Sequence, residues 1–244
     1  MQLFRADLHI HTVLSPCGSL EMSPERIVNE AIARGLHIIA ITDHNSTRQC
    51  RAVMEAGQEK GLFVIGGAEI STREEVHCVT LFEDIATLEQ FQTYIDRYLP
   101  NIPNNPDKFG YQIWVNRDEE IEGEEPRFLL SGLEQSIDDV EQMVHSLNGL
   151  FIPAHIDRPS FSLFSQLGFF PPALVCNAVE ISGNATQVFI DSAGIKGKYR
   201  ILSSSDAHYP NQIGSRFTTF EMREATFEEV RKQLRIKREI NIEL

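Results

Sequence analysis

The chain alternates between short apolar runs and stretches in which apolar residues recur at helical spacing. The run at 37–42 (HIIAIT) is apolar almost throughout, which is typical of a strand covered on both faces. Runs of this kind predict strands at 3–10, 37–42, 62–65, 76–82, 150–154, 178–181 and 199–204.

Capping signals predict helices between these strands. Ser23 and Pro24 form a typical helix start, and Gly35 ends that helix. Thr226 opens the last helix with a capping box. Further helices are predicted at 47–60, 88–98 and 136–147. Such alternation predicts a parallel sheet with helices outside, either as a barrel or as an open doubly wound sheet.

Side chains that bind metals follow at least five of the predicted strands. A barrel gathers residues from the carboxyl ends of many strands at one mouth, whereas an open sheet uses mainly one switch point. With about seven core strands, we therefore expect an α/β fold, a distorted (β/α)7 TIM-like barrel with a metal cluster at its C-terminal mouth. The barrel is expected to form a single domain over residues 1–244.

Residues 100–127 interrupt the alternation of strand and helix. Asn-Pro turn signals precede a short apolar segment and an acidic run. The stretch is either a solvated insertion or a lid that carries Tyr111 and Trp114 over the mouth of the barrel.

Composition restricts the partners and the compartment. The formal charge of the 244 residues is −13 and the pI is near 5.0, which disfavours extended nucleic acid. No apolar run is long enough to span a membrane, and the N-terminus does not resemble a signal peptide. The four widely spaced cysteines are expected to be reduced thiols in a cytoplasmic protein.

Imidazoles and carboxylates gather at these strand ends in pairs. His9 and His11 are two residues apart on a strand, so both point to the same face. Asp206 and His208 repeat this spacing, and Glu69 follows small residues that allow close approach. Each alone could be a core or surface residue, as could the other strand-end histidines. Together they favour one metal centre, and the remaining candidates are His44, His77 and His155.

These motifs, in this order, resemble those of the PHP (polymerase and histidinol phosphatase) superfamily, from position 7 to position 208. The resemblance implies a (β/α)7 barrel, two or three divalent metal ions and phosphoester hydrolysis. Zinc is the favoured metal, with manganese or iron as alternatives. The implied ligands are His9, His11, Glu69 and Asp206 for a first ion, Glu69, His77 and His155 for a second, and His44 and His208 for a third.

Cys17 departs from the commonest family pattern, in which His or Asp stands six residues beyond His11. A thiolate there would be a soft ligand that favours zinc. Alternatively Cys17 is a small residue in a turn, and the third site is weak or absent. The amidohydrolase superfamily is the nearest enzymatic alternative, but none of the six lysines ends a predicted strand to serve as its bridging ligand.

The expected activity is hydrolysis of a small phosphate ester or short nucleotide by a metal-bridging hydroxide. Alternatives are a PHP-type exonuclease acting on oligonucleotides and a non-catalytic metal-binding regulatory domain. Asp43 would orient a ligand or contact substrate, and Glu180 faces the mouth or packs structurally. The residues expected to act in catalysis are Glu69, Asp206 and His208, with Arg158 and Arg216 as phosphate clamps or surface arginines.

Overall fold

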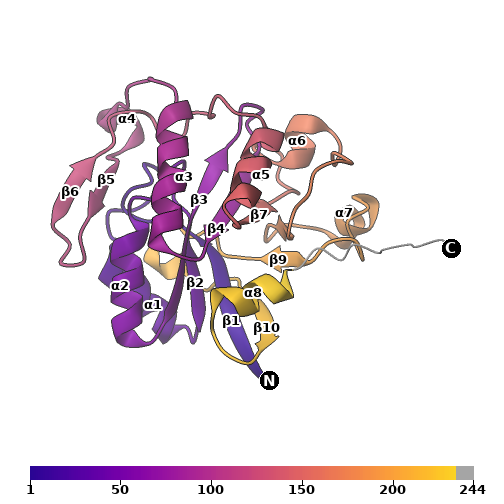
Figure 1. The fold of residues 1–244 in the computed structure, drawn as a ribbon, viewed down its shortest axis with the longest axis horizontal. Helices are drawn as coiled ribbons and strands as arrows, with labels where there is room; N and C mark the ends of the chain where they lie inside the picture. The colour runs from indigo at the N-terminus through magenta and orange to yellow at the C-terminus, as the bar shows by residue number, and fades with distance from the viewer. Residues whose placement is uncertain (235–244) are drawn as a thin grey trace.

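A curled six-stranded sheet forms the centre of a mixed α/β fold (Figure 1). The computed structural model describes residues 1–234, so the end of the expected domain, with Lys237, lies outside the described residues. A separate parallel pair consists of β8 (Val179–Ile181) and β9 (Ile201–Ser203). The strands of the main sheet lie in the order β10 (Thr218–Met222), β1 (Gln2–Ile10), β2 (Ile38–Ile41), β3 (Phe63–Ser71), β4 (His77–Phe82) and β7 (Leu150–Pro153).

The direction of β4 differs from the expected parallel sheet. β1, β2 and β3 are parallel, but β4 is antiparallel to both β3 and β7. Only residues 72–76 join β3 to β4, whereas a parallel crossover needs about a dozen residues or more. The connection is therefore a hairpin, and the prediction of a parallel sheet is wrong at this strand.

β10 was not predicted, and it pairs antiparallel with β1 at the edge of the sheet. Its Phe220 and Met222 are buried, whereas Thr219 and Glu221 are exposed. This alternation with a period of two is the signal of a half-buried strand. It was present in the sequence, but the stretch lacks the continuous apolar run that marks the central strands.

Helices cover the outer face of the sheet, and a second apolar cluster fills the inside of its curl. Alternate strand residues build this inner cluster, for example Ala6 and Leu8 of β1. α8 (Phe227–Gln233) adds Phe227 and Val230 beside the start of β1, and Leu234 follows the helix in the same cluster (Figure 1). The opposite end of the strands is thereby left for polar residues. The principal outer helices are α1 (Pro24–Ala33), α2 (Cys50–Lys60), α3 (Ile85–Tyr98) and α5 (Ile137–Ser146).

No helix within residues 1–234 combines the length and the apolar character needed to cross a membrane.

Shorter helical segments connect the later strands. They are α6 (Leu163–Leu167), α7 (Gln187–Ser192) and the 3₁₀ helix η1 (Pro210–Gln212).

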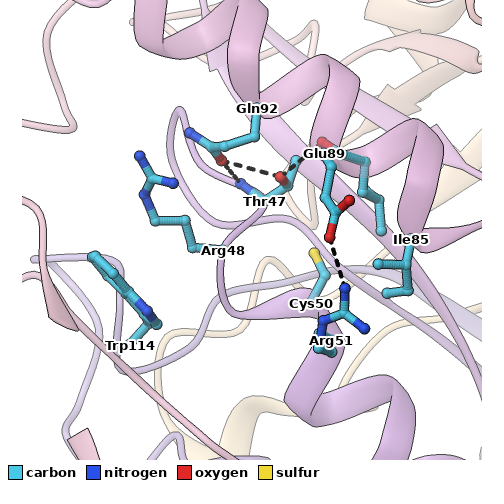
Figure 2. Close-up of a pocket in the computed structure, with 9 residues that line it drawn as sticks. Thr47, Arg48, Cys50, Arg51, Ile85, Glu89, Gln92 and Trp114 are labelled. Atoms are coloured by element: carbon cyan, nitrogen blue, oxygen red, sulfur yellow. Dashed lines mark hydrogen bonds and ion pairs between the residues drawn. The ribbon is translucent and has the colours of Figure 1, made fainter. Parts of the chain in front are cut away.

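Residues 100–127 form the short helix α4 (Pro106–Phe109) and a hairpin of β5 (Ile113–Val115) and β6 (Ile121–Glu124). Gln49 is fully buried and fixes this hairpin, because its side chain donates to the Val115 carbonyl and accepts from the Val115 N–H, both at 2.9 Å. The Arg48 guanidinium lies 5.2 Å from the centre of the Trp114 ring, and both line a pocket beside α2 and α3 (Figure 2). That the segment acts as a lid stays a prediction.

Replacing Gln49 by alanine should lower the free energy of unfolding by about 1–3 kcal/mol, because two backbone groups of Val115 lose their partners in a buried place. Urea denaturation followed by circular dichroism measures the change. The matched control is Gln90→Ala on the exposed face of α3, where we expect a change within about 0.5 kcal/mol. Equal stability of the two variants would show that Gln49 does not fix the hairpin.

Candidate metal centre

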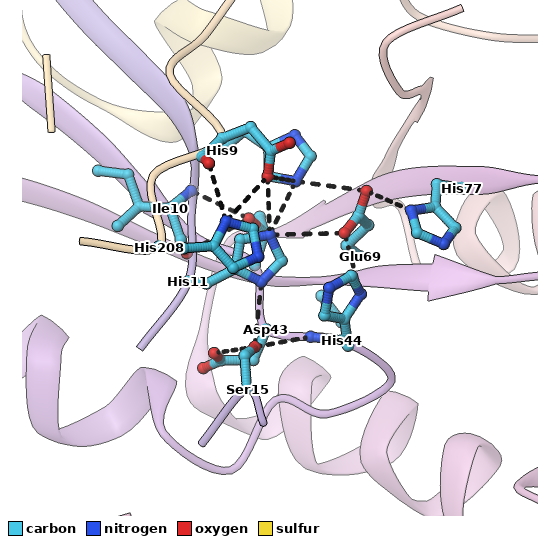
Figure 3. A network of polar contacts seen from close by, with 12 residues as sticks. His9, Ile10, His11, Ser15, Asp43, His44, Glu69, His77 and His208 are labelled. Carbon is cyan, nitrogen blue, oxygen red and sulfur yellow. Dashed lines mark hydrogen bonds and ion pairs between the residues drawn. The ribbon is translucent and has the colours of Figure 1, made fainter. Parts of the chain in front are cut away.

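Candidate ligands from six segments of the chain converge at one end of the sheet (Figure 3). β1 and β3 carry theirs near their carboxyl ends, and the loops after β2, β7 and β9 supply others. His77 is instead the first residue of β4. Because β4 is antiparallel to β3, its beginning pairs with Ser71 at the end of β3, which brings His77 to the same edge as Glu69.

The first group consists of His9, His11, Glu69 and Asp206, which offer ligand atoms within 4.8 Å of one another. Oδ1 of Asp206 lies 3.1 Å from His11 Nε2 and 3.4 Å from His9 Nε2. Glu69 Oε1 also lies 3.4 Å from His9 Nε2. These are the four residues that the family resemblance assigns to one ion.

The other groups differ in detail from the expected sets. His44 joins Glu69 and His77 in a second group, and a third consists of His11, His44 and His208. His155 belongs to neither, although its Nε2 lies 3.0 Å from Glu69 Oε1. The expected histidines thus lie together in the structure. His44, which was expected to share an ion with His208, also lies in a group with Glu69 and His77.

Glu69 belongs to both the first and the second ligand group and is almost completely buried. Its Oε1 lies 2.9 Å from His77 Nδ1 and 3.0 Å from His155 Nε2. Its Oε2 lies 3.0 Å from His44 Nδ1. Oε1 also lies 3.4 Å from His9 Nε2 and Oε2 lies 3.5 Å from His11 Nε2, so the carboxylate contacts both ligand groups, which is the arrangement needed to bridge two ions.

The protonation states of Glu69, His11 and His44 suit metal binding. Burial raises the pKa of Glu69, but the neighbouring His77 and His9 lower it further and hold it well below its usual range. Burial lowers the pKa of His11 to about 4 and that of His44 well below its ordinary value. At neutral pH Glu69 is therefore charged and both of these imidazoles are neutral, which is how such groups bind metals.

Glu180 orients His9 from behind the cluster. Its two carboxylate oxygens lie 3.1 and 3.2 Å from His9 Nδ1, so that Nε2 faces Glu69 and Asp206. Although burial lowers it, the charges of Glu180, Asp206 and Glu69 raise the pKa of His9 well above its ordinary value. A carboxylate behind a histidine ligand fixes the ring and raises its basicity. The sequence had left this role of Glu180 open.

Asp43 is buried and holds the loop that follows β1. It accepts hydrogen bonds of 2.7 Å from Thr12 N, Thr12 Oγ1 and Ser15 Oγ. Ser15 Oγ in turn lies 3.0 Å from His11 Nδ1. These contacts favour the orienting role of Asp43 over a direct contact with substrate.

The donor set fits a divalent cation. Nδ1 of His44 and Nδ1 of His155 are buried and form no hydrogen bond, although His44 Nδ1 is close to Glu69. The Nε2 atoms of His9 and His11 are only 3.2 Å apart. Buried nitrogens without partners are unfavourable. Cations beside His9 and His11 and beside His44 would satisfy the lone pairs of these nitrogens and neutralise the carboxylates.

Adding a divalent cation should therefore raise the melting temperature of chelator-treated protein. A ligand at 1,000 times its Kd that binds only the folded state stabilises it by about 4 kcal/mol. For a chain of this size that corresponds to an increase of about 8–16 °C. Differential scanning fluorimetry with Zn²⁺, Mn²⁺ and Fe²⁺ measures the effect. An unchanged melting temperature with all three ions would contradict a metal centre.

The remaining candidates lie around the cluster. Nη2 of Arg158 is 2.6 Å from Asp206 Oδ2, so Arg158 reaches the centre directly. Arg216 instead donates to the Gly183 carbonyl at 2.9 Å, on the loop after β8. Cys17 is exposed and belongs to none of the three groups formed by the described residues. Its role as a ligand stays a prediction.

Known proteins resemble this chain in sequence and in fold. The uncharacterized protein YqxK of Bacillus subtilis is 23% identical over 262 residues, which covers 94% of this chain and 61% of YqxK. The 5′-3′ exoribonuclease Rnm of Salmonella typhimurium is 41% identical over 85 residues, 33% of this chain and 28% of that protein. The lesion-specific endonuclease PfuEndoQ of Pyrococcus furiosus has the same fold, with a TM-score of 0.71 and 21% identity over 96% of this chain and 56% of its own.

The expectation of a small phosphorylated substrate, with extended nucleic acid disfavoured, is wrong. Endonuclease Q with this fold was solved in complex with a 27-mer duplex that carries an abasic lesion at the active site, and Rnm is an exoribonuclease. The error came from the net charge. A charge of −13 is a sum over the whole chain, whereas cations bound at the site would set the local field there.

The sequence also matches family descriptions directly. The PHP domain covers residues 7–209, and the PHP-associated region covers residues 196–238. The first match includes every candidate ligand from His9 to His208. The resemblance inferred from the motifs is thus confirmed, and the chain belongs to the PHP domain family.

Proposed function

We propose that this chain is a metal-dependent phosphodiesterase that cleaves nucleic acid. The observation that carries the proposal is the position of Glu69, whose carboxylate contacts His9 and His11 of one ligand group and His44 and His77 of the other. Two ions about 3.5–4 Å apart on a shared carboxylate are typical of nucleases and phosphatases. The named relatives, an exoribonuclease and a lesion-specific endonuclease, support nucleic acid as the substrate. The chain spans 61% of YqxK and 56% of the endonuclease, so the activity of a longer protein is part of this proposal.

His9, His11, Glu69 and Asp206 would hold one ion, and His44, Glu69 and His77 would hold another. His11, His44 and His208 form a third site, but a neutral imidazole has one free lone pair, so this site would be an alternative use of His11 and His44. Cys17 would complete that third site as a thiolate. The many imidazoles favour zinc, with manganese or iron as alternatives. Bound ions would lower the pKa of water and neutralise charge on a phosphate.

Arg158 is the proposed phosphate clamp. Its side chain is 41% exposed while Nη2 stays 2.6 Å from Asp206 Oδ2. The carboxylate thus fixes one end of the guanidinium, and the remaining N–H groups are free to donate to phosphate oxygens. Arg216 is proposed only as a more distant contact, because it is bonded to the backbone of Gly183.

His208 is the proposed proton donor to the leaving oxygen when it does not hold an ion. It has the most exposed side chain of the candidate imidazoles, at 21%, and its ring stacks on His11 at 4.0 Å. Its Nδ1 lies 2.9 Å from the carbonyl oxygen of Asp206, which fixes the ring and leaves Nε2 for substrate. Asp206 would position both His208 and Arg158.

We propose further that the curled sheet belongs to a distorted seven-stranded barrel that forms one domain. Parallel backbone contacts between Ile10 and Ala207 support closure of the ring from β9 to β1. The Phe151 carbonyl accepts from Asn177 N at 2.9 Å, which supports a link from β7 towards β8. The shared inner cluster of these strands supports the same arrangement.

Labelled single-stranded and duplex oligonucleotides, with a nucleoside monophosphate for comparison, test the proposal. Metal-loaded protein should cleave at least one oligonucleotide, and EDTA should stop the reaction. Hydrolysis of the monophosphate alone would contradict nucleic-acid cleavage. Stoichiometric metal binding without hydrolysis of any substrate would support a regulatory domain instead.

A further inference from the structure

One loop carries three side chains that lie at the candidate centre. It runs from His155, just after β7, to Ser162, the N-cap of α6. His155 contacts Glu69 and Arg158 contacts Asp206. The ring of Phe161 lies on the ring of His77, with centroids 5.0 Å apart and an angle of 20° between the planes. The metal ligands, the clamp and Phe161 are thus fixed relative to one another.

The backbone at Phe161 is unusual for its side chain. Its φ is +54°, in the left-handed region that bulky residues rarely adopt. Six other non-glycine residues among those described share a positive φ, but Phe161 is the only hydrophobic one. Its carbonyl accepts a hydrogen bond of 3.0 Å from His77 N, which explains the backbone position. Glycine would supply this carbonyl with less strain, so the aromatic side chain itself needs an explanation.

Burial does not supply that explanation, because Phe161 is 45% exposed. One face of the ring contacts His77, and much of the rest of the side chain is open to solvent. Nearly half of the residue's surface therefore gains nothing by packing in the free protein. Strained residues of this kind cluster at ligand sites, where bound partners use them.

The loop is fixed before any substrate arrives. The two oxygens of Asp157 accept from Ser182 N and Ser182 Oγ, each at 2.6 Å. Ser162 Oγ donates to the Arg158 carbonyl at 2.7 Å, and the same residue caps α6. An aromatic ring held in place loses little conformational freedom on binding, which favours affinity.

We propose that Phe161 is a stacking platform for the nucleobase next to the scissile phosphate. This inference rests on the proposed phosphodiesterase function. Arg158 and the ions would hold the phosphate, and the neighbouring base would lie on the exposed ring. Every base has a flat face, so stacking of this kind favours nucleotides over phosphodiesters without a base. It also requires the base to leave a duplex stack, and so favours single-stranded or disrupted sites.

Phe161→Gly tests the platform because it removes the ring but keeps the backbone carbonyl that accepts from His77 N. Glycine also adopts the positive φ without strain. The substrates are two oligonucleotides of the same sequence, and in one of them the nucleotide beside the scissile phosphate has no base. Metal-dependent cleavage of each is measured. We expect kcat/KM to fall by about 5- to 150-fold on the intact oligonucleotide, mainly through KM, and to change little on the abasic one. Phe161→Tyr should retain the preference for the base, and Phe169→Leu, at an exposed phenylalanine after α6, should leave both rates unchanged.

Metal content is measured for every variant, since Phe161 also contacts His77. Equal losses on both oligonucleotides, or loss of bound metal in Phe161→Gly, would overturn the platform and leave the phosphodiesterase intact. A metal-loaded wild-type protein that cleaves neither oligonucleotide would contradict the proposed function, and the platform with it.

Discussion

Glu69→Gln should lower the rate of metal-dependent phosphodiester hydrolysis by more than about 100-fold. Loss of a group behind a metal ligand costs about 10- to 100-fold, and Glu69 is itself the proposed bridging ligand. The amide retains the shape of the side chain but has no charge and only one oxygen. The first and second ligand groups would then no longer share a carboxylate. Initial rates on a labelled oligonucleotide at saturating Mn²⁺ or Zn²⁺ measure the effect.

The matched control for this variant is Glu125→Gln. Glu125 is also buried, but its carboxylate pairs with Arg127 beside the β5–β6 hairpin. We expect its rate to equal that of the wild type, and circular dichroism should show both variants folded. Undiminished turnover by Glu69→Gln, in protein free of contaminating nuclease, would exclude the proposed role of this carboxylate.

Glu180→Gln should lower the affinity for the metal by about 10- to 100-fold without removing any ligand. Glu180 lies behind His9, 3.1 Å from its Nδ1, and its negative charge makes that imidazole a stronger ligand. Glutamine can still accept the hydrogen bond, so the change isolates the charge from the position. Competition with a metal chelator of known affinity measures the loss.

Two comparisons make this second prediction specific. Glu122→Gln on the exposed strand β6 removes the same charge at a distance and should leave the affinity unchanged. Excess metal should restore activity to Glu180→Gln but not to Glu69→Gln. Wild-type affinity in Glu180→Gln would mean that the carboxylate serves packing alone.

Most of the helices and strands could be predicted from local patterns in the sequence. The continuous apolar runs at β2 and β7 and the glycines after α1 and α2 were sufficient to locate these elements. The direction of β4 depended on the length of one connection, which strand and helix signals do not report. The edge strand β10 has only two buried apolar positions, so its signal was weaker than that of the central strands.

The candidate ligands were identifiable because residue type and strand position coincide at each of them. The sequence could not predict as well which ligands share an ion, because that depends on distances between segments that are far apart in the chain. The structure puts His44 with Glu69 and His77, where the family resemblance had put His155. The stacking of Phe161 on His77 depends on a positive φ and on a tertiary hydrogen bond, neither of which has a signal in the sequence.

Anomalous scattering from crystals grown with Zn²⁺ tests the central claim most directly, because it locates each ion relative to Glu69. We predict at least two peaks about 3.5–4 Å apart, both within bonding distance of the Glu69 carboxylate. One peak would lie beside His9, His11 and Asp206, and the other beside His44 and His77. A single peak, or peaks that do not contact Glu69, would contradict a centre bridged by this carboxylate.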